Sequence, residues 1–161
     1  MKMKKQDYTA TILVKASARK TFDAINHVEE WWSENIEGSS EKLNDVFTIH
    51  FGEAFVEMKI VEFVPDKKVA WDVTDCYLHW FADKKEWKGT RIIFEMTAAG
   101  ELTKIQFTHV GLTPQVECYD NCVKGWDQYA KESLTKLINE GQGLPQKKVM
   151  ATIETTEQDL V

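Results

Sequence analysis

The sequence predicts an α+β domain in which a curved antiparallel sheet of about six strands wraps around one long C-terminal helix. Three observations predict this fold class. Short segments with alternating apolar residues follow one another between residues 7 and 110, separated by turn residues. Residues 113–139 instead repeat apolar side chains every three or four positions, which is typical of one face of an α-helix. Two short helical segments are expected soon after the first strand, between residues 18 and 32.

The first strand is predicted at residues 7–15, DYTATILVK, which alternates apolar and polar side chains. Ser17 is expected to cap a short helix over residues 18–26, because its hydroxyl can accept a hydrogen bond from the first turn. A second helical turn is expected to carry Trp31 and Trp32. Residues 33–44 are polar and contain a Gly-Ser-Ser run, so they are predicted to form a loop.

The remaining strands follow in quick succession and are joined by tight turns, as in an antiparallel meander. Turn residues stand between them at Gly52-Glu53, at Pro65-Asp66 and at Gly100. The predicted strands are residues 45–51, 54–64, 69–74, 90–97 and 102–110.

Residues 76–88 are the hardest segment to place, because they mix aromatic and charged side chains without a clear period. Tyr77, His79, Trp80 and Phe81 gather there. Two interpretations stay open for this aromatic group: an ordinary strand, or a lid or partner-binding patch.

The predicted long helix has recognisable ends. Thr113 can cap its first turn and Pro114 suits the first helical position, whereas Gly141 suits the position just past the end. Gly125 lies in its interior, where glycine costs about 1 kcal/mol relative to alanine. We therefore expect another part of the molecule to approach the helix closely at Gly125.

Length and pattern predict one domain over residues 1–143 of the 161, followed by a C-terminal tail over residues 144–161 that loses periodicity. Hydrophobic residues make up 43% of the chain, which is enough to form a core. The net charge of −6 disfavours nucleic acid or an anionic membrane as a partner. No apolar run is long enough to span a bilayer, so we predict a cytoplasmic location.

The sequence shows no persuasive catalytic or metal-binding motif. The three cysteines lack zinc-type spacing, and we find no nucleophile with a base, no paired carboxylates and no phosphate-binding glycines. We therefore predict no metal and no cofactor, and a binding protein rather than an enzyme.

Four segments, in the same order, are similar to those of a known family: the exit from the first strand with its helix and tryptophans, the long strand with its proline turn, the last hairpin, and a glycine-tryptophan pair on the final helix. They are ASARKTFDAINHVEEWW (16–32), GEAFVEMKIVEFVPDKKVAWDV (52–73), GTRIIFEMTAAGELTKIQFTHVGL (89–112) and GWDQYAKESLTKLIN (125–139). The chain thus resembles the START-like (SRPBCC) superfamily, which has the birch-pollen-allergen or helix-grip fold. Within it, the chain is most similar to the AHSA-like branch, the homologues of the heat-shock-protein-90 ATPase activator.

The resemblance implies a cavity between the sheet and the long helix, in which many relatives hold an apolar ligand. The alternative for each lining residue is that it fills a packed core. The residues expected to line the cavity are Trp32, Met58, Ile60, Trp71, Val73, Phe94, Phe107, His109, Tyr119, Val123, Trp126 and Ala130.

His109 shares a predicted strand face with Ile105 and Phe107, so we expect it to point inward. A buried imidazole can act as an acid or base, or can bond a neighbouring group of the protein. The first functional hypothesis is a module that binds a hydrophobic or aromatic small molecule. A cyclase- or hydratase-like enzyme using His109, and a chaperone-related protein-interaction module, are the alternatives. A chaperone and a second copy of the chain are the protein partners considered.

Overall fold

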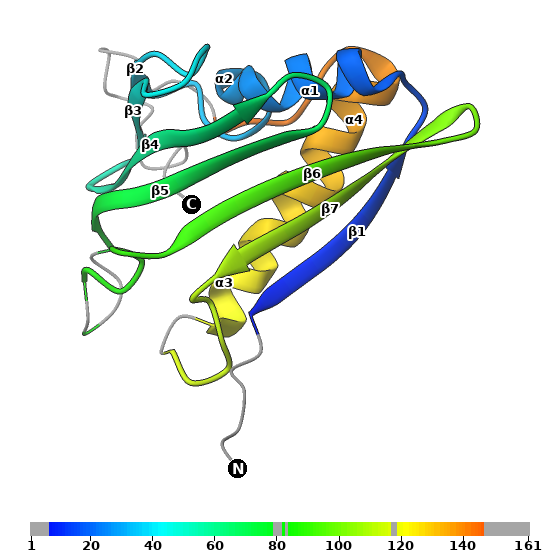
Figure 1. The fold of residues 1–161 in the computed structure, drawn as a ribbon. Coiled ribbons are helices and arrows are strands. Elements are labelled where there is room, and N and C mark those ends of the chain that lie inside the picture. Colours follow the sequence, from blue (N-terminus) through cyan, green and yellow to red (C-terminus); the bar gives the residue numbers. More distant parts are fainter. Residues whose placement is uncertain (1–6, 79–81, 83, 117–118, 147–161) are drawn as a thin grey trace, which may run out of the picture.

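The computed structural model describes residues 7–78, 82, 84–116 and 119–146. Its described residues form one antiparallel sheet of seven strands in the order β1-β7-β6-β5-β4-β3-β2, packed against helices on one face (Figure 1). The strands are β1 (Tyr8–Val14), β2 (Ile36–Gly38), β3 (Val46–Phe51), β4 (Ala54–Val64), β5 (Lys68–Tyr77), β6 (Arg91–Ala99) and β7 (Leu102–Val110). The helices are α1 (Ala18–Asn26), α2 (Val28–Trp31), α3 (Tyr119–Trp126), the π-helical segment η1 (Asp127–Ser133) and α4 (Leu134–Glu140). The predicted α+β helix-grip fold is confirmed.

The sheet contains one strand that the sequence does not predict. The polar segment predicted to be a loop includes β2, in which Ile36 lies opposite Ile49 at the edge of the sheet. A side chain at Gly38 would meet the carbonyl oxygen of Val46 at 2.3 Å, so glycine allows β2 to lie close against β3. A strand of three residues is too short to show a period of two, which is why the pattern missed it.

Strand β5 is longer than predicted, because it continues through Cys76 and Tyr77. Its pairing with β4 shifts register between Glu57 and Met58, so the alternation along the sequence is broken near this point. Tyr77 thus lies in an ordinary strand, whereas His79, Trp80 and Phe81 lie outside the described residues.

The long C-terminal helix crosses the face of the sheet that carries the core (Figure 1). Predicted to start near Thr113, it begins at Tyr119 in the part of the chain that is described. Thr113–Val116 instead form a turn, in which the Val116 N–H donates to the Thr113 carbonyl at 3.0 Å. Proline suits turns as well as first helical positions, so Pro114 alone did not distinguish the two.

Two predicted helix ends are confirmed. The Ser17 hydroxyl accepts the Lys20 N–H at 3.1 Å and caps α1. Gly141 ends α4 with φ +87°, and its N–H donates to the Leu137 carbonyl at 2.8 Å. No described helix has both the length and the apolar character needed to cross a membrane.

The chain after α4 turns back along the segment that follows α2. Gln146 donates its N–H to the Trp32 carbonyl at 2.9 Å and accepts the Glu34 N–H at 2.8 Å. A side chain at Gly143 would meet the Glu30 carbonyl oxygen at 2.4 Å, so this return needs glycine. Residues 147–161 lie outside the described part, and the predicted tail from residue 144 stays a prediction.

Candidate functional site

Five aromatic side chains on the inner face of the sheet and its helices form one buried group, called here the aromatic cluster: Trp32, Trp71, Phe94, Phe107 and Trp126. Their ring centroids follow one another at 4.6–6.2 Å: 4.9 Å from Trp32 to Trp126, 6.2 Å from Trp32 to Trp71, 5.2 Å from Trp71 to Phe94, 5.0 Å from Phe94 to Phe107 and 4.6 Å from Phe107 to Trp126. These distances are typical of packed aromatic pairs. The structure thus brings together rings that lie far apart in the sequence.

The other predicted lining residues divide into a buried and a half-buried set. Met58, Ile60, Val73, His109 and Ala130 are buried, as is the whole aromatic cluster. Tyr119 and Val123, both on α3, are only half-buried. The half-buried positions therefore lie at the start of the long helix.

Trp87 belongs to the same region, and the sequence reasoning missed it. Only 8% of the residue is exposed, and its ring stacks on Trp126 with centroids 5.7 Å apart and planes 13° apart. Its indole N–H points at the Cys122 sulfur, 3.2 Å away. In the sequence, Trp87 stands among charged residues in a segment without regular hydrophobic spacing. A single large aromatic residue in such a segment was the signal that could have indicated a buried side chain.

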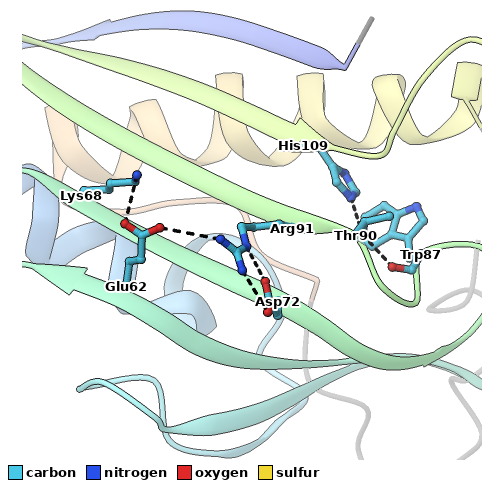
Figure 2. Close-up of polar contacts among 7 residues, drawn as sticks. All are labelled: Glu62, Lys68, Asp72, Trp87, Thr90, Arg91 and His109. Carbon is cyan, nitrogen blue, oxygen red and sulfur yellow. Dashed lines mark hydrogen bonds and ion pairs between the residues drawn. The ribbon is translucent and has the colours of Figure 1, made fainter. Parts of the chain in front are cut away.

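His109 is held in a continuous chain of hydrogen bonds, and Figure 2 shows the part that runs from His109 through Thr90 to Trp87. The Trp126 indole N–H donates to His109 Nδ1 at 3.1 Å, so Nδ1 carries no proton. The proton therefore lies on Nε2, which donates to Thr90 Oγ1 at 2.9 Å. The Thr90 hydroxyl in turn donates to the Trp87 carbonyl at 2.7 Å. Both nitrogens of the ring are satisfied within the protein.

The surroundings keep His109 neutral. Complete burial lowers the pKa of the imidazole from 6.5 to about 3. Protonation of Nδ1 would also set two N–H groups, those of His109 and Trp126, against each other. In this arrangement the imidazole links the long helix to the segment before β6 through hydrogen bonds. An acid–base role would first require one of its two hydrogen bonds to break.

Half-buried apolar residues of β1 and α3 form a region called here the α3 rim. Tyr8, Ala10 and Tyr119 pack against the core, and Val123 lies one turn along α3 from Tyr119. The Tyr8 hydroxyl donates to Asp127 Oδ1 at 3.3 Å and so joins the first strand to the long helix. Burial, and then the neighbouring Asp127 carboxylate, raise the pKa of Tyr8 to about 12. At the other end of the helix Leu134, Leu137 and Ile138 of α4 are buried.

Gly125 does not mark a close approach, so that expectation is wrong. A side-chain carbon built at Gly125 would meet no heavy atom of the described residues within 4 Å, apart from its chain neighbours and the backbone of its own helix. The glycine–tryptophan pair therefore matters through Trp126, which is buried in the aromatic cluster.

The polar side chains on the outer face of the sheet form a separate group of ion pairs (Figure 2). Glu62 bridges Lys68 at 3.0 Å and Arg91 at 3.8 Å, and Arg91 also binds Asp72. The hydrogen bond to Asp72 raises the pKa of Arg91. These side chains are about a third or more exposed, so the group stabilises the surface weakly and offers no enclosed site.

A metal site has no support in the part of the chain that is described. No three or more histidine, cysteine or acidic side chains lie close enough there to hold an ion. Cys118 lies outside that part.

The sequence matches no protein-family model, and no curated protein matches it significantly. Solved structures do match the fold. The Aha1 dimer from Colwellia psychrerythraea, solved in solution, is 21% identical over 86% of this chain and 99% of that chain, with a TM-score of 0.69. The protein SSP2350 from Staphylococcus saprophyticus is 14% identical over 86% of this chain and 96% of that chain, with a TM-score of 0.65.

A third structure, DynU16 of the dynemicin biosynthetic locus, is 13% identical over 85% of this chain and 48% of that chain, with a TM-score of 0.58. The fold is thus an α+β helix grip, similar to that of these solved structures. The particular fold is Aha1-like, and the resemblance seen in the sequence is confirmed at the level of the fold.

Proposed function

We propose that this protein binds a hydrophobic or aromatic small molecule between the sheet and α3. The observation that carries the proposal is the α3 rim, where Tyr119 packs against the core although it is only half-buried, and Val123, one turn further along the helix, is half-buried too. A hydrophobic ligand would cover this apolar surface and remove it from water, which lowers the free energy. At the α4 end the helix already buries its apolar side chains against the protein.

The polar groups near the rim favour binding over catalysis. The Trp126 N–H is taken by His109, and the Trp87 N–H points at Cys122. The faces and edges of the rings are what remains for a ligand, so recognition would rest on shape and on ring contacts. His109 has both nitrogens engaged, which supports a binding module rather than a cyclase- or hydratase-like enzyme.

The ligand-contacting residues follow from this placement. Tyr119, Val123 and Trp126 would contact the ligand from the helix, and Phe107 and His109 from the sheet. The deeper residues predicted from the sequence, Trp32, Met58, Ile60, Trp71, Val73, Phe94 and Ala130, would form the floor of the site.

The test uses a library of medium-chain fatty acids and planar aromatic compounds, with unfolding temperature and tryptophan fluorescence as readouts. Val123→Trp adds a large ring at the rim, and Asn121→Trp adds the same ring at an exposed position of the same helix. We expect at least one compound class to raise the unfolding temperature. Val123→Trp should then weaken its binding by about tenfold or more, a loss of about 1.4 kcal/mol or more, while Asn121→Trp should not.

Two results would count against the proposal. The first is that no compound in the library changes either readout. The second is that a compound binds Val123→Trp as tightly as it binds the unaltered chain, which would place its site away from α3.

We also propose that the chain forms a homodimer. The support is the Aha1 protein of Colwellia psychrerythraea, which is a dimer and shares the fold over 99% of its length. Sedimentation equilibrium across a range of concentrations measures this directly. A chaperone partner stays a prediction from the sequence.

A further inference from the structure

We propose that two copies of this chain join through strand β1, paired antiparallel about Thr11, so that the two sheets continue into one another. The inference rests on the homodimer proposed above and names its surface. The partner surface is therefore a second copy of β1.

The position of β1 in the sheet leaves one side of its backbone open. It is the first strand in the sheet order and pairs only with β7, and Figure 1 shows it along the margin of the sheet. The Tyr8 N–H points toward the β7 side, where it donates to the Leu112 carbonyl at 2.9 Å. Successive residues of a strand point their backbone groups in alternate directions. Thr9, Thr11 and Leu13 therefore direct theirs away from the sheet.

These outward groups have no hydrogen-bond partner among the described residues. The open stretch is bounded, because Asn139 Oδ1 accepts the Lys15 N–H at 2.7 Å and so covers the next outward group. Three consecutive outward residues thus form an exposed pairing edge, called here the β1 edge: Thr9, Thr11 and Leu13.

The β1 edge lacks the features that usually prevent two edges from pairing. Residues 8–14 contain no charge and no proline, and their register with β7 runs without a bulge. At the opposite margin, β2 is only three residues long and ends at Gly38. Of the two margins, β1 is therefore the one suited to receive another strand.

The β1 edge is complementary to itself. With two copies antiparallel about Thr11, the two Thr11 residues face each other, and Thr9 of each copy faces Leu13 of the other. Each facing pair can exchange two backbone hydrogen bonds. Leu13 is 54% exposed, and this register would cover it in part with Thr9 and Thr11 of the second copy.

The charges at the two ends agree with the same register. Asp7 precedes β1 and Lys15 follows it, with no charge between them. An antiparallel pairing centred on Thr11 places Asp7 of each copy opposite Lys15 of the other. Opposite charges across a strand pair favour that alignment over a shifted one.

The test places like or opposite charges at the centre of the pairing. Thr11→Lys and Thr11→Glu each set two like charges face to face, while an equimolar mixture sets opposite charges face to face. The side chain of Thr11 is exposed, so both variants should fold. Thr97→Lys and Thr97→Glu, at an exposed position of β6, are the matched controls. Sedimentation equilibrium of the full chain measures the dimer dissociation constant.

We expect each Thr11 variant to weaken the dimer by about fivefold at low salt, and the mixture to recover it. The Thr97 variants should dimerise like the unaltered chain. In the unaltered chain, the amides of Thr9, Thr11 and Leu13 should gain protection from hydrogen exchange as concentration rises.

A chain that stays monomeric at every concentration would overturn both the homodimer and its surface. A dimer that is equally strong in the Thr11 variants would overturn this surface alone. Amides of the β1 edge that are protected independently of concentration would show that another segment of the same chain covers the edge, which would also overturn the inference.

Discussion

For His109, the sequence predicted the direction of the side chain but not its hydrogen-bond partners. Its alternation with Ile105 and Phe107 predicted an inward side chain, and its complete burial confirms this. Its partners are Trp126 on the long helix and Thr90, the residue before β6, which are 17 and 19 residues away in the sequence. A period along one strand says which face a side chain takes, but not what it meets there.

The lowered pKa of His109 predicts a dependence of stability on pH. The folded value of about 3 lies below the ordinary 6.5, so between these values the unfolded chain binds the proton more readily. The contribution to stability is therefore complete above pH 6.5 and is lost as the pH falls toward 3.

His109→Gln removes the titrating group while keeping one donor and one acceptor. Below pH 6.5, the unfolding free energy of the unaltered chain should fall relative to that of the variant by about 1.4 kcal/mol per pH unit. Urea unfolding of both proteins at several pH values measures the difference. Parallel curves for the two proteins would show that His109 does not titrate in this way.

Thr90 is expected to stabilise the fold through its hydroxyl, which accepts from His109 and donates to the Trp87 carbonyl. Thr90→Val removes the hydroxyl at nearly constant shape and should cost about 1–3 kcal/mol, because His109 Nε2–H loses its partner. Thr90→Ser keeps the hydroxyl and should cost less. A Thr90→Val variant as stable as the unaltered chain would show that the hydroxyl does not contribute.

At the scale of elements, two glycines near the C-terminus differ in what surrounds them. Among the described residues, a side chain at Gly125 would meet no atom within 4 Å beyond its own helix, whereas one at Gly143 would meet the Glu30 carbonyl oxygen at 2.4 Å and the Ser133 carbonyl oxygen at 3.1 Å. A glycine in the sequence indicates a special position. It does not show whether another segment packs closely against it or whether it only weakens the helix.

Gly125→Ala should therefore stabilise the protein by about 1 kcal/mol, because alanine favours the helix. Gly143→Ala should destabilise it, because backbone atoms must move to admit the side chain. Thermal unfolding of the two variants, made in the same background, compares them. A destabilising Gly125→Ala would show that the helix is tightly approached there after all.

The elements themselves were predicted well where they are long and regular. Strands β3, β4 and β7 and helix α1 have the predicted bounds within a residue, because their alternation and turn residues are local. The short β2 and the far end of β5 were not predicted. Their positions depend on pairing with neighbouring strands rather than on a local period.

At the scale of the whole molecule, the two proposals use different sides of the same strand. The inward side chains of Tyr8 and Ala10 belong to the α3 rim, whereas the outward backbone of Thr9 and Thr11 belongs to the β1 edge. Ligand binding and self-association can therefore be tested separately, with Val123→Trp for the first and the Thr11 variants for the second.

The sequence alone determined the fold class, the inward faces of the long strands, the end of the final helix at Gly141 and the buried positions of the aromatic cluster. These follow from periodicity and turn chemistry, which act between neighbours in the chain. Only the tertiary structure decided that Trp87 packs on Trp126, that both nitrogens of His109 are bonded, and that the β1 edge stays open among the described residues. Those features depend on contacts between segments that are far apart in the chain, and no local spacing of residues in the sequence indicates such contacts.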